Sequence, residues 1–242
     1  MTAPTPLSPA RAPLGRVVVL TGAGVSAESG VPTFRGQGGL WRTYRAEDLA
    51  TPEAFARDPA LVWAWYDWRR QLVAACQPNA AHVTLAAMEA ALPDFTLITQ
   101  NVDGLHERAG SRHALRLHGS LWGVRCVREG TRRDNFDVPL KELPPRCACG
   151  ALERPDVVWF GETLDRGVIT AALRAARHAD LMLVVGTSAL VQPAASLPLV
   201  TLEAGGRVLE FNVARTPLSD YADAVMLGPA AETLPRWWAG QA

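Results

Sequence analysis

Polar side chains follow four short apolar runs, each of which is typical of a buried parallel strand. The runs are 95–99, 115–117, 181–185 and 208–211, and they lead into Gln100-Asn101-Val102-Asp103, His118-Gly119-Ser120, Gly186-Thr187-Ser188 and Asn212. In an open α/β sheet the ligand crevice lies outside the carboxyl ends of the strands. Asn, Asp, Ser and Thr also cap helices, which explains any one of these positions alone. The four together favour a single polar site.

A fifth run, 17–20, ends in a glycine-rich turn. The turn Gly22-Ala23-Gly24-Val25-Ser26-Ala27 matches G-x-G-x-x-A, in which the backbone approaches a pyrophosphate at a helix N-terminus. Glycine removes the Cβ atoms that would block this approach. The acidic residue that usually follows about 20 positions later is missing, and the chain instead continues into a glycine-rich segment at 36–39. The stretch therefore indicates a nucleotide loop that differs from an ordinary dehydrogenase fingerprint.

Strands alternate with helices along most of the chain. Helical periodicity covers 60–75, 80–91, 168–178 and 194–204, and a further strand is expected at 224–227. This alternation predicts an α/β fold with a Rossmann-type, doubly wound parallel sheet. Inserts at about 36–92 and 120–155 are expected to form a smaller helical and zinc-ribbon-like domain. The proline-rich residues 1–15 are expected to be a disordered lead to a single domain at 16–242.

Composition excludes several classes of function. The 242 residues include 24 basic and 24 acidic side chains, so no excess of positive charge points to a nucleic acid or an anionic membrane. No run approaches the ~18 apolar residues that span a bilayer, and the N-terminus lacks the apolar core of a signal peptide. Four cysteines, two of them in Cys147-Ala148-Cys149, fit a reducing compartment and a metal site better than disulfides. We therefore expect a cytoplasmic protein.

Six sequence segments occur along the chain in a fixed order: GAGVSAESGVPTFR, TQNVDGLHERAG, LHGS, RPDVVWFGE, VGTSALVQPAA and EFNV. Together they resemble the sirtuin family of NAD-dependent protein deacylases. The resemblance implies that NAD is a co-substrate, that acyl-lysine proteins or peptides are the substrates, and that nicotinamide and O-acyl-ADP-ribose are the products. A monomer is the expected state.

Two alternatives share the same NAD site. An ADP-ribosyltransferase or NAD hydrolase would bind NAD but would not need a group that recognises the acyl chain. A weakly catalytic NAD-sensing interaction protein is the other alternative, and the intact His118 and Asn101 argue against it.

The resemblance also implies residue roles. His118 is the expected catalytic base, and Asn101 is the second expected catalytic residue. A histidine with a pKa near ~6.5 suits the removal of a ribose hydroxyl proton. The substrate peptide backbone is expected to pair with Val157, Val158, Trp159, Phe160 and Gly161. The expected NAD contacts are Gly22, Ala23, Gly24, Ser26, Glu28, Phe34, Arg35, Trp41, Gln100, Asn101, Val102, Asp103, Gly186, Thr187, Ser188, Asn212, Val213 and Ala230.

Tyr66 and Arg69 stand three residues apart in the predicted helix 60–75, so both side chains project from one face. A hydroxyl beside a guanidinium can bind a carboxylate, because arginine contacts both of its oxygens. An amphipathic helix with a half-buried tyrosine and a solvated arginine is the ordinary alternative. The pair nevertheless resembles the Tyr-x-x-Arg of class III sirtuins, which recognises succinyl, malonyl or glutaryl lysine. We therefore expect a preference for acidic acyl groups over acetyl.

Four residues could hold a structural zinc ion. Sirtuins usually carry two Cys-x-x-Cys pairs, but here Glu129 stands at the second position after Cys126, and the second pair is the shorter Cys147-x-Cys149. Zinc accepts carboxylate oxygen, so the four residues could still form a site. A degenerate module with buried cysteines is equally compatible with the sequence, because this donor set binds zinc less strongly.

Overall fold

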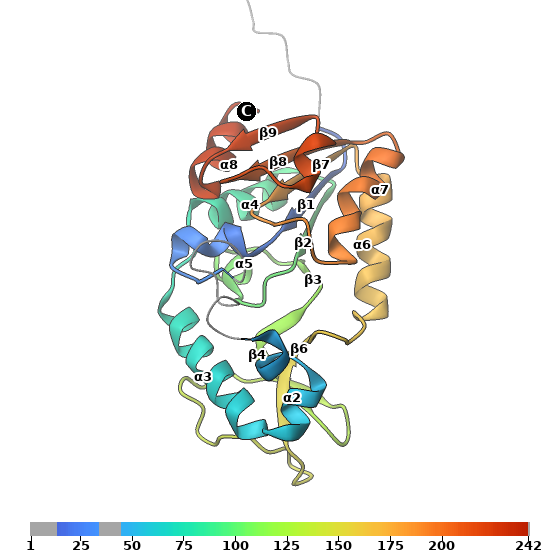
Figure 1. The fold of residues 1–242 in the computed structure, drawn as a ribbon. Helices are drawn as coiled ribbons and strands as arrows, with labels where there is room; N and C mark the ends of the chain where they lie inside the picture. Colours follow the sequence, from blue (N-terminus) through green and yellow to red (C-terminus); the bar gives the residue numbers. More distant parts are fainter. Residues whose placement is uncertain (1–13, 34–44, 242) are drawn as a thin grey trace, which may run out of the picture.

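The computed structural model of the protein describes residues 14–33 and 45–241 (Figure 1). Within these ranges six parallel strands form one sheet, here called the large sheet, in the order β3-β2-β1-β7-β8-β9. The order reverses between β1 and β7, as in dinucleotide-binding folds. The strands are β1 (Val17–Thr21), β2 (Phe95–Thr99), β3 (Leu115–Arg116), β7 (Leu181–Val185), β8 (Arg207–Asn212) and β9 (Ala224–Leu227).

Helices cover both faces of the large sheet, with α6 and α7 on one side and α4 and α8 on the other (Figure 1). The central strand β1 is apolar on both faces, as a covered parallel strand must be. Its Val17 and Val19 pack toward α4 and α8, and Val18 and Leu20 pack toward α6 and α7. These helices are α4 (Ala80–Ala91), α6 (Arg166–His178), α7 (Leu197–Glu203) and α8 (Ala230–Ala239). The structure confirms the predicted doubly wound α/β fold.

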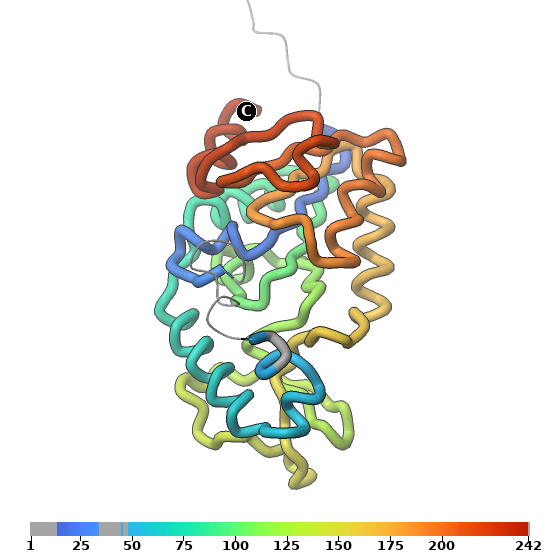
Figure 2. The backbone as a smooth tube through the Cα atoms, viewed as in Figure 1, coloured from blue at the N-terminus to red at the C-terminus, as the bar shows by residue number. Residues whose placement is uncertain are grey.

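A smaller domain lies beyond the carboxyl edge of the large sheet. The chain passes through it twice, first between β1 and β2 and again between β3 and α6 (Figure 2). The first passage supplies the helices α2 (Pro52–Arg57) and α3 (Pro59–Ala75). The second passage supplies an antiparallel sheet, here called the small sheet, with the order β5-β4-β6 and the strands β4 (Gly119–Cys126), β5 (Arg132–Asp134) and β6 (Glu153–Val157).

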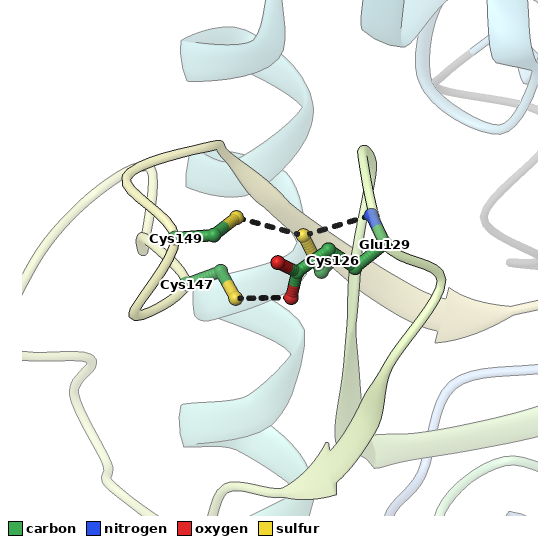
Figure 3. Close-up of side chains that lie close together, drawn as sticks. All are labelled: Cys126, Glu129, Cys147 and Cys149. Carbon is green, nitrogen blue, oxygen red and sulfur yellow. Dashed lines mark hydrogen bonds between the residues drawn. The ribbon is translucent and has the colours of Figure 1, made fainter.

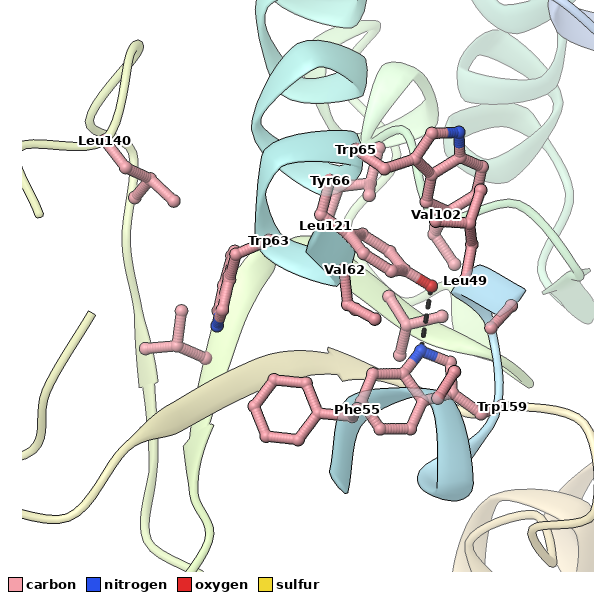
Figure 4. Packing of buried hydrophobic residues seen from close by; sticks show 14 of the residues in the cluster. Leu49, Phe55, Val62, Trp63, Trp65, Tyr66, Val102, Leu121, Leu140 and Trp159 are labelled. Atoms are coloured by element: carbon pink, nitrogen blue, oxygen red, sulfur yellow. Dashed lines mark hydrogen bonds between the residues drawn. The ribbon is translucent and has the colours of Figure 1, made fainter. Parts of the chain in front are cut away.

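Aromatic side chains fill the core of the small domain (Figure 4). Tyr66 of α3 and Phe55 of α2 pack against Trp159, which follows β6, and Trp63 of α3 packs against Tyr66. The buried guanidinium of Arg70 donates hydrogen bonds to the backbone carbonyls of 121, 135 and 137, so it ties α3 to β4 and to the loop after β5. The two passages of the chain therefore contribute to one core.

Local sequence explains where the long helices begin. Asp58 caps α3 by accepting a hydrogen bond from the backbone N–H of Leu61, and Pro59 fits the first turn, where no N–H partner is needed. Asn79 and His82 form a reciprocal capping box at the start of α4. The predicted helix 194–204 differs: a 3₁₀ turn η3 (Ala194–Ser196) precedes α7, because Pro198 fits only the first turn of the α-helix.

The remaining elements are short. The glycine-rich turn leads into a 3₁₀ helix rather than an α-helix, and no described helix is long and apolar enough to cross a membrane. These short elements are η1 (Ala23–Ser29), α1 (Ala46–Leu49), α5 (Leu105–Arg108) and η4 (Pro217–Asp220).

Candidate active site

A cavity of about 830 Å³ lies between the carboxyl edge of the large sheet and the small domain. It is lined by polar residues at the carboxyl ends of β2, β3, β7 and β8, as the sequence predicted, and by the turn after β1. Of the expected residues, those that line the cavity are Gly22, Ala23, Gly24, Tyr66, Arg69, Gln100, Asn101, Val102, His118, Val157, Val158, Trp159, Phe160, Gly161, Gly186, Thr187, Ser188, Asn212, Val213 and Ala230. Phe34, Arg35 and Trp41 lie outside the described residues.

The glycines of the turn after β1 allow two backbone segments to meet. Gly24 N–H donates to the carbonyl of Gly186 at 2.7 Å, and a Cβ atom on Gly24 would lie 2.7 Å from that same oxygen. A Cβ on Gly22 would lie 2.7 Å from the Cβ of Thr187. The glycines are therefore needed for contact with the end of β7, in addition to any ligand that approaches the turn.

His118 stands just after β3, where the chain leaves the large sheet. Its Nδ1 lies 2.9 Å from the carbonyl oxygen of Gln100, which can only accept, so Nδ1 carries the hydrogen. The other nitrogen, Nε2, is then the basic one in the neutral ring. Burial lowers the pKa of His118 below its usual value, although the bond to Gln100 opposes this shift. A neutral histidine with a free lone pair on Nε2 can accept a proton at neutral pH.

Asn101 is held by residues that lie behind the cavity wall. Its Nδ2 donates to Ser26 Oγ at 3.2 Å, and Ser26 Oγ in turn donates to Asp103 Oδ2 at 2.8 Å. Asp103 also accepts from the backbone N–H of Leu105 at 2.9 Å. Ser26 and Asp103 are buried and do not line the cavity, so in this structure they orient the amide of Asn101.

Glu28 also lies away from the cavity. Its carboxylate accepts a hydrogen bond of 3.0 Å from the backbone N–H of Ala231, at the start of α8. A negative charge is stabilising at a helix N-terminus. Glu28 therefore ties η1 to α8, and Ala230, the residue before Ala231, lines the cavity.

Two buried histidines complete the network, although sequence reasoning assigned neither of them to the site. His82 Nε2 lies 3.3 Å from Ser26 Oγ, and His106 Nε2 lies 2.9 Å from Thr21 Oγ1. Burial lowers the pKa of His82 to about 3 and that of His106 to about 4. Both rings are therefore neutral hydrogen-bonding groups. The sequence feature that could have predicted a structural role for His82 is its position three residues after Asn79, which allows a capping box.

Hydrogen bonds join three strand ends on the far side of the cavity. Gln100 Nε2 donates to Thr187 Oγ1 at 3.0 Å, and Asn212 Nδ2 donates to the carbonyl of Thr187 at 2.7 Å.

Two loops beyond these strand ends, 190–192 and 214–217, also line the cavity, although the sequence predicted no contact for them. Their types gave little chemical signal, because most of them are not groups that catalyse or bind metals.

Tyr66 and Arg69 form the end of the cavity in the small domain. Both are buried, so the solvated arginine of an ordinary amphipathic helix is not what the structure shows. The guanidinium carbon of Arg69 lies 4.8 Å from the ring centroid of Trp65. Burial lowers the pKa of Arg69, and Tyr66 and Asp103 act in the opposite direction. Burial also raises the pKa of Tyr66, which keeps its hydroxyl protonated.

Cys126, Glu129, Cys147 and Cys149 come together in the small domain (Figure 3). Cys126 ends β4, Glu129 lies in the turn that follows it, and the other two cysteines lie in the loop before β6. Their four ligand atoms all lie within 4.8 Å of one another. Cys126 Sγ is 3.6 Å from Cys149 Sγ, and Cys147 Sγ is 3.8 Å from Glu129 Oε2. Tetrahedral zinc with bonds of about 2.0–2.3 Å places its ligand atoms roughly 3.3–3.8 Å apart. The donor set therefore fits a structural zinc ion in chemistry, and these two distances match its ligand spacing.

The fold and the cavity together define an α/β protein with a dinucleotide-type crevice that is closed on one side by a small domain. Solved structures share this arrangement. A crystal structure described as a Sir2 homolog–NAD complex superposes with a TM-score of 0.87 at 50% identity, covering 93% of this chain and 89% of that one. A structure described as Sir2–p53 peptide–NAD+ gives 0.82 at 33% identity, covering 93% and 92%.

Sequence comparison leads to the same family. The model of the Sir2 family matches residues 22–193. An NAD-dependent protein deacylase of Aquifex aeolicus (strain VF5) is 55% identical over 86% of this chain and 87% of its own length. NAD-dependent protein deacylase 2 of Pyrobaculum aerophilum is 54% identical over 90% and 88%. The chain therefore belongs to the Sir2 family.

Proposed function

We propose that this protein is an NAD-dependent protein-lysine deacylase that prefers succinyl or malonyl over acetyl groups. One observation carries the proposal: a single cavity joins the glycine turn after β1, the side chain of His118 and the Tyr66–Arg69 pair. The relatives named above support NAD-dependent deacylation. The acidic preference rests on the burial and position of Tyr66 and Arg69.

NAD would be held at the carboxyl edge of the large sheet. The edge fits a dinucleotide, because the turn at 22–24 lines the cavity with glycines, which carry no side chain, and Thr187, Ser188 and Asn212 add polar groups. When bound, NAD supplies a nicotinamide–ribose bond that breaks to leave an acceptor for the acyl group. The protein's own contributions are to orient Asn101 through Ser26 and to keep His118 neutral.

His118 would remove a proton from a ribose hydroxyl. Its Nδ1–H is fixed by the carbonyl of Gln100, so only Nε2 is available to take that proton. The imidazolium formed would keep the bond to Gln100, which favours the charged ring and raises the pKa against the effect of burial. General-base catalysis of this kind contributes about 10²–10⁴-fold to a rate.

The acyl chain would extend toward α3. A succinyl carboxylate loses water when it enters this end of the cavity, and that loss must be offset by a buried partner. Arg69 can bind two carboxylate oxygens and Tyr66 can donate one more hydrogen bond. An acetyl group offers neither side chain a partner, so the pair should favour acidic acyl groups.

The substrate peptide would lie along the segment 157–161. Val158 N–H already donates to the carbonyl of His118, and Phe160 N–H donates to that of Ala50. The N–H of Trp159 is also used, because it donates to the carboxylate of Glu162. Pairing with a peptide would therefore rely on the carbonyl groups of this segment and on Gly161. Main-chain pairing gives affinity with little sequence discrimination.

One experiment tests this function as a whole. The purified protein is incubated with NAD and with peptides that differ only in carrying acetyl-lysine or succinyl-lysine, and both products are followed by mass spectrometry. We expect nicotinamide release to depend on the acylated peptide and kcat/KM to be higher for succinyl-lysine. Nicotinamide release without acyl transfer would instead support an NAD hydrolase.

A further inference from the structure

Trp159 makes a hydrogen bond that fixes the role of the Tyr66 hydroxyl. Its Nε1–H donates to the Tyr66 oxygen at 2.9 Å, and both side chains are buried (Figure 4). An indole N–H can only donate, so the tyrosine oxygen must be the acceptor. The hydroxyl hydrogen is then directed away from the indole. Because Tyr66 lines the cavity, this hydrogen is available to a ligand there.

Trp159 is itself held from two directions. The guanidinium carbon of Arg154 lies 3.4 Å from the centroid of the indole ring. Arg154 donates two bonds to the carboxylate of Glu162, of 2.6 and 2.9 Å, and Glu162 Oε2 also accepts the backbone N–H of Trp159 at 2.8 Å. One carboxylate therefore fixes both the backbone of Trp159 and the cation stacked on its ring.

Neighbouring groups further restrict the ring. Phe55 lies 5.4 Å from Trp159, centroid to centroid, and Arg154 also donates to the carbonyl of Val157 at 2.9 Å. Burial alone would raise the pKa of Glu162, but the bonds from Arg154 and from Trp159 N–H outweigh it, and the net shift is downward. The carboxylate therefore stays ionised at neutral pH and continues to hold the ring in place.

We propose that Trp159 is a positioning residue for acyl selectivity, which acts through the hydroxyl of Tyr66. The inference rests on the proposed acidic-acyl preference and adds a residue to it. The indole N–H turns the Tyr66 hydrogen toward the acyl carboxylate, and a hydroxyl that accepts one bond is a stronger donor in the next. Acetyl-lysine has no carboxylate to receive this bond. Trp159 should therefore contribute to succinyl-lysine recognition and much less to acetyl-lysine recognition.

The test is Trp159→Phe, which keeps an aromatic ring and removes the N–H. We expect the succinyl-to-acetyl ratio of kcat/KM to fall about three- to tenfold, the size expected for one hydrogen bond between neutral groups. The loss should be found mainly in a higher KM for succinyl-lysine, because the contact forms in the ground state. Trp63→Phe is the matched control, since Trp63 is also a buried indole of this core but donates to the carbonyl of Glu153. Its ratio should stay within about twofold of the wild type, by the same hydrogen-bond scale.

A double-mutant cycle separates this mechanism from general damage. If Trp159 acts through the Tyr66 hydroxyl, Trp159→Phe should change the ratio by less than about twofold in a Tyr66→Phe background. Equal effects of Trp159→Phe with and without the hydroxyl would overturn the inference, as would an unchanged ratio in the single variant. The wild-type ratio and Arg69→Met test the acidic-acyl proposal by itself, which fails if the wild type does not prefer succinyl-lysine or if Arg69→Met leaves the ratio unchanged. If both of these tests support the proposal and Tyr66→Phe leaves the ratio unchanged, only the inference about Trp159 fails, so the two failures can be told apart.

Discussion

The large sheet and the small domain differ in what holds them together. The large sheet is a regular ladder whose central strands are covered by apolar side chains on both faces. The small domain depends on single polar groups inside an aromatic core, such as Arg70 on three backbone carbonyls and Trp63 on the carbonyl of Glu153. Many similar apolar contacts tolerate the loss of one, whereas each of these polar groups leaves unsatisfied partners when removed.

The two sides of the cavity come from these two differently built regions. The cofactor side is built from strand ends on the large sheet, where position is set by the backbone ladder. The proposed acyl side is built from buried side chains of the small domain, which belong to a hydrophobic cluster separate from those that cover the large sheet. We therefore expect that substitutions can perturb the reaction and the choice of acyl group separately.

The largest expected effect is at His118, where the chain passes from one region to the other. His118→Ala should lower kcat/KM on every acyl-lysine by about 10²-fold or more, because the general base is lost. The melting temperature and NAD affinity should change little. Deacylation kinetics and calorimetry measure these quantities, and His113→Ala, at an exposed histidine, is the control. Nearly normal turnover would exclude His118 from the proton transfer.

Arg69→Met should change the choice of acyl group and leave the reaction with acetyl-lysine nearly unchanged. A bond between charged groups contributes about 1.5–3 kcal/mol, so the succinyl-to-acetyl ratio of kcat/KM should fall about 10- to 150-fold. Tyr66→Phe should cause a smaller change in the same direction. Arg57→Met, at an exposed arginine of α2, serves as the control in the same kinetic assay. Equal losses on both peptides would show that Arg69 supports the fold and does not select the acyl group.

Lowering the pH should reduce the free energy of unfolding through the two buried histidines, His82 and His106. Their folded pKa values, about 3 and about 4, lie below the ordinary value of about 6.5. The unfolded chain therefore binds more protons between these limits, so stability is complete above pH ~6.5 and is lost as the pH falls toward the folded values. Each histidine contributes up to ~1.4 kcal/mol per pH unit in that window.

Denaturant unfolding between pH 7 and 4 measures this effect. His82→Asn should reduce the slope of stability against pH, and His113→Asn should leave it as in the wild type. An equal slope for His82→Asn and the wild type would show that His82 does not contribute to the acid sensitivity.

Removal of metal should affect the small domain alone. If Cys126, Glu129, Cys147 and Cys149 hold zinc, the purified protein should contain about one equivalent, and a strong chelator should lower the melting temperature. A shift of ~2–4 °C is expected for each kcal/mol lost. Glu129→Cys should retain zinc more tightly. A metal-free protein with unchanged melting temperature and activity would contradict a structural zinc ion.

The sequence predicted the large sheet well because its signals are local and repeated. The predicted strands 95–99, 181–185 and 224–227 and the helix 80–91 have the observed bounds. Apolar runs bounded by polar residues specify such elements without any knowledge of the partner strand. The convergence of the strand ends followed from the general topology of parallel sheets.

The small sheet was not predicted, and its physical basis explains why. β5 is Arg132-Arg133-Asp134, an exposed strand with no apolar alternation, and its pairing with β4 depends on contacts outside the strand itself. The bond from Trp159 to Tyr66 joins residues 93 positions apart, so no local pattern could show it. The roles of His82 and His106 likewise depend on burial and on distant hydroxyl groups.

The shared core of the small domain also bears on the order of folding. Trp63 and Glu153 are 90 positions apart, and Tyr66 and Trp159 are separated by 93, so neither passage of the chain completes this core alone. Closing so long a loop costs entropy before any contact forms, and chains rich in such contacts fold slowly. Pairing of β1 with β2 and of β2 with β3 would shorten that loop by bringing the two passages to one edge. We therefore expect the large sheet to form before the small domain, so that substitutions at Trp63 should speed unfolding and leave the refolding rate nearly unchanged.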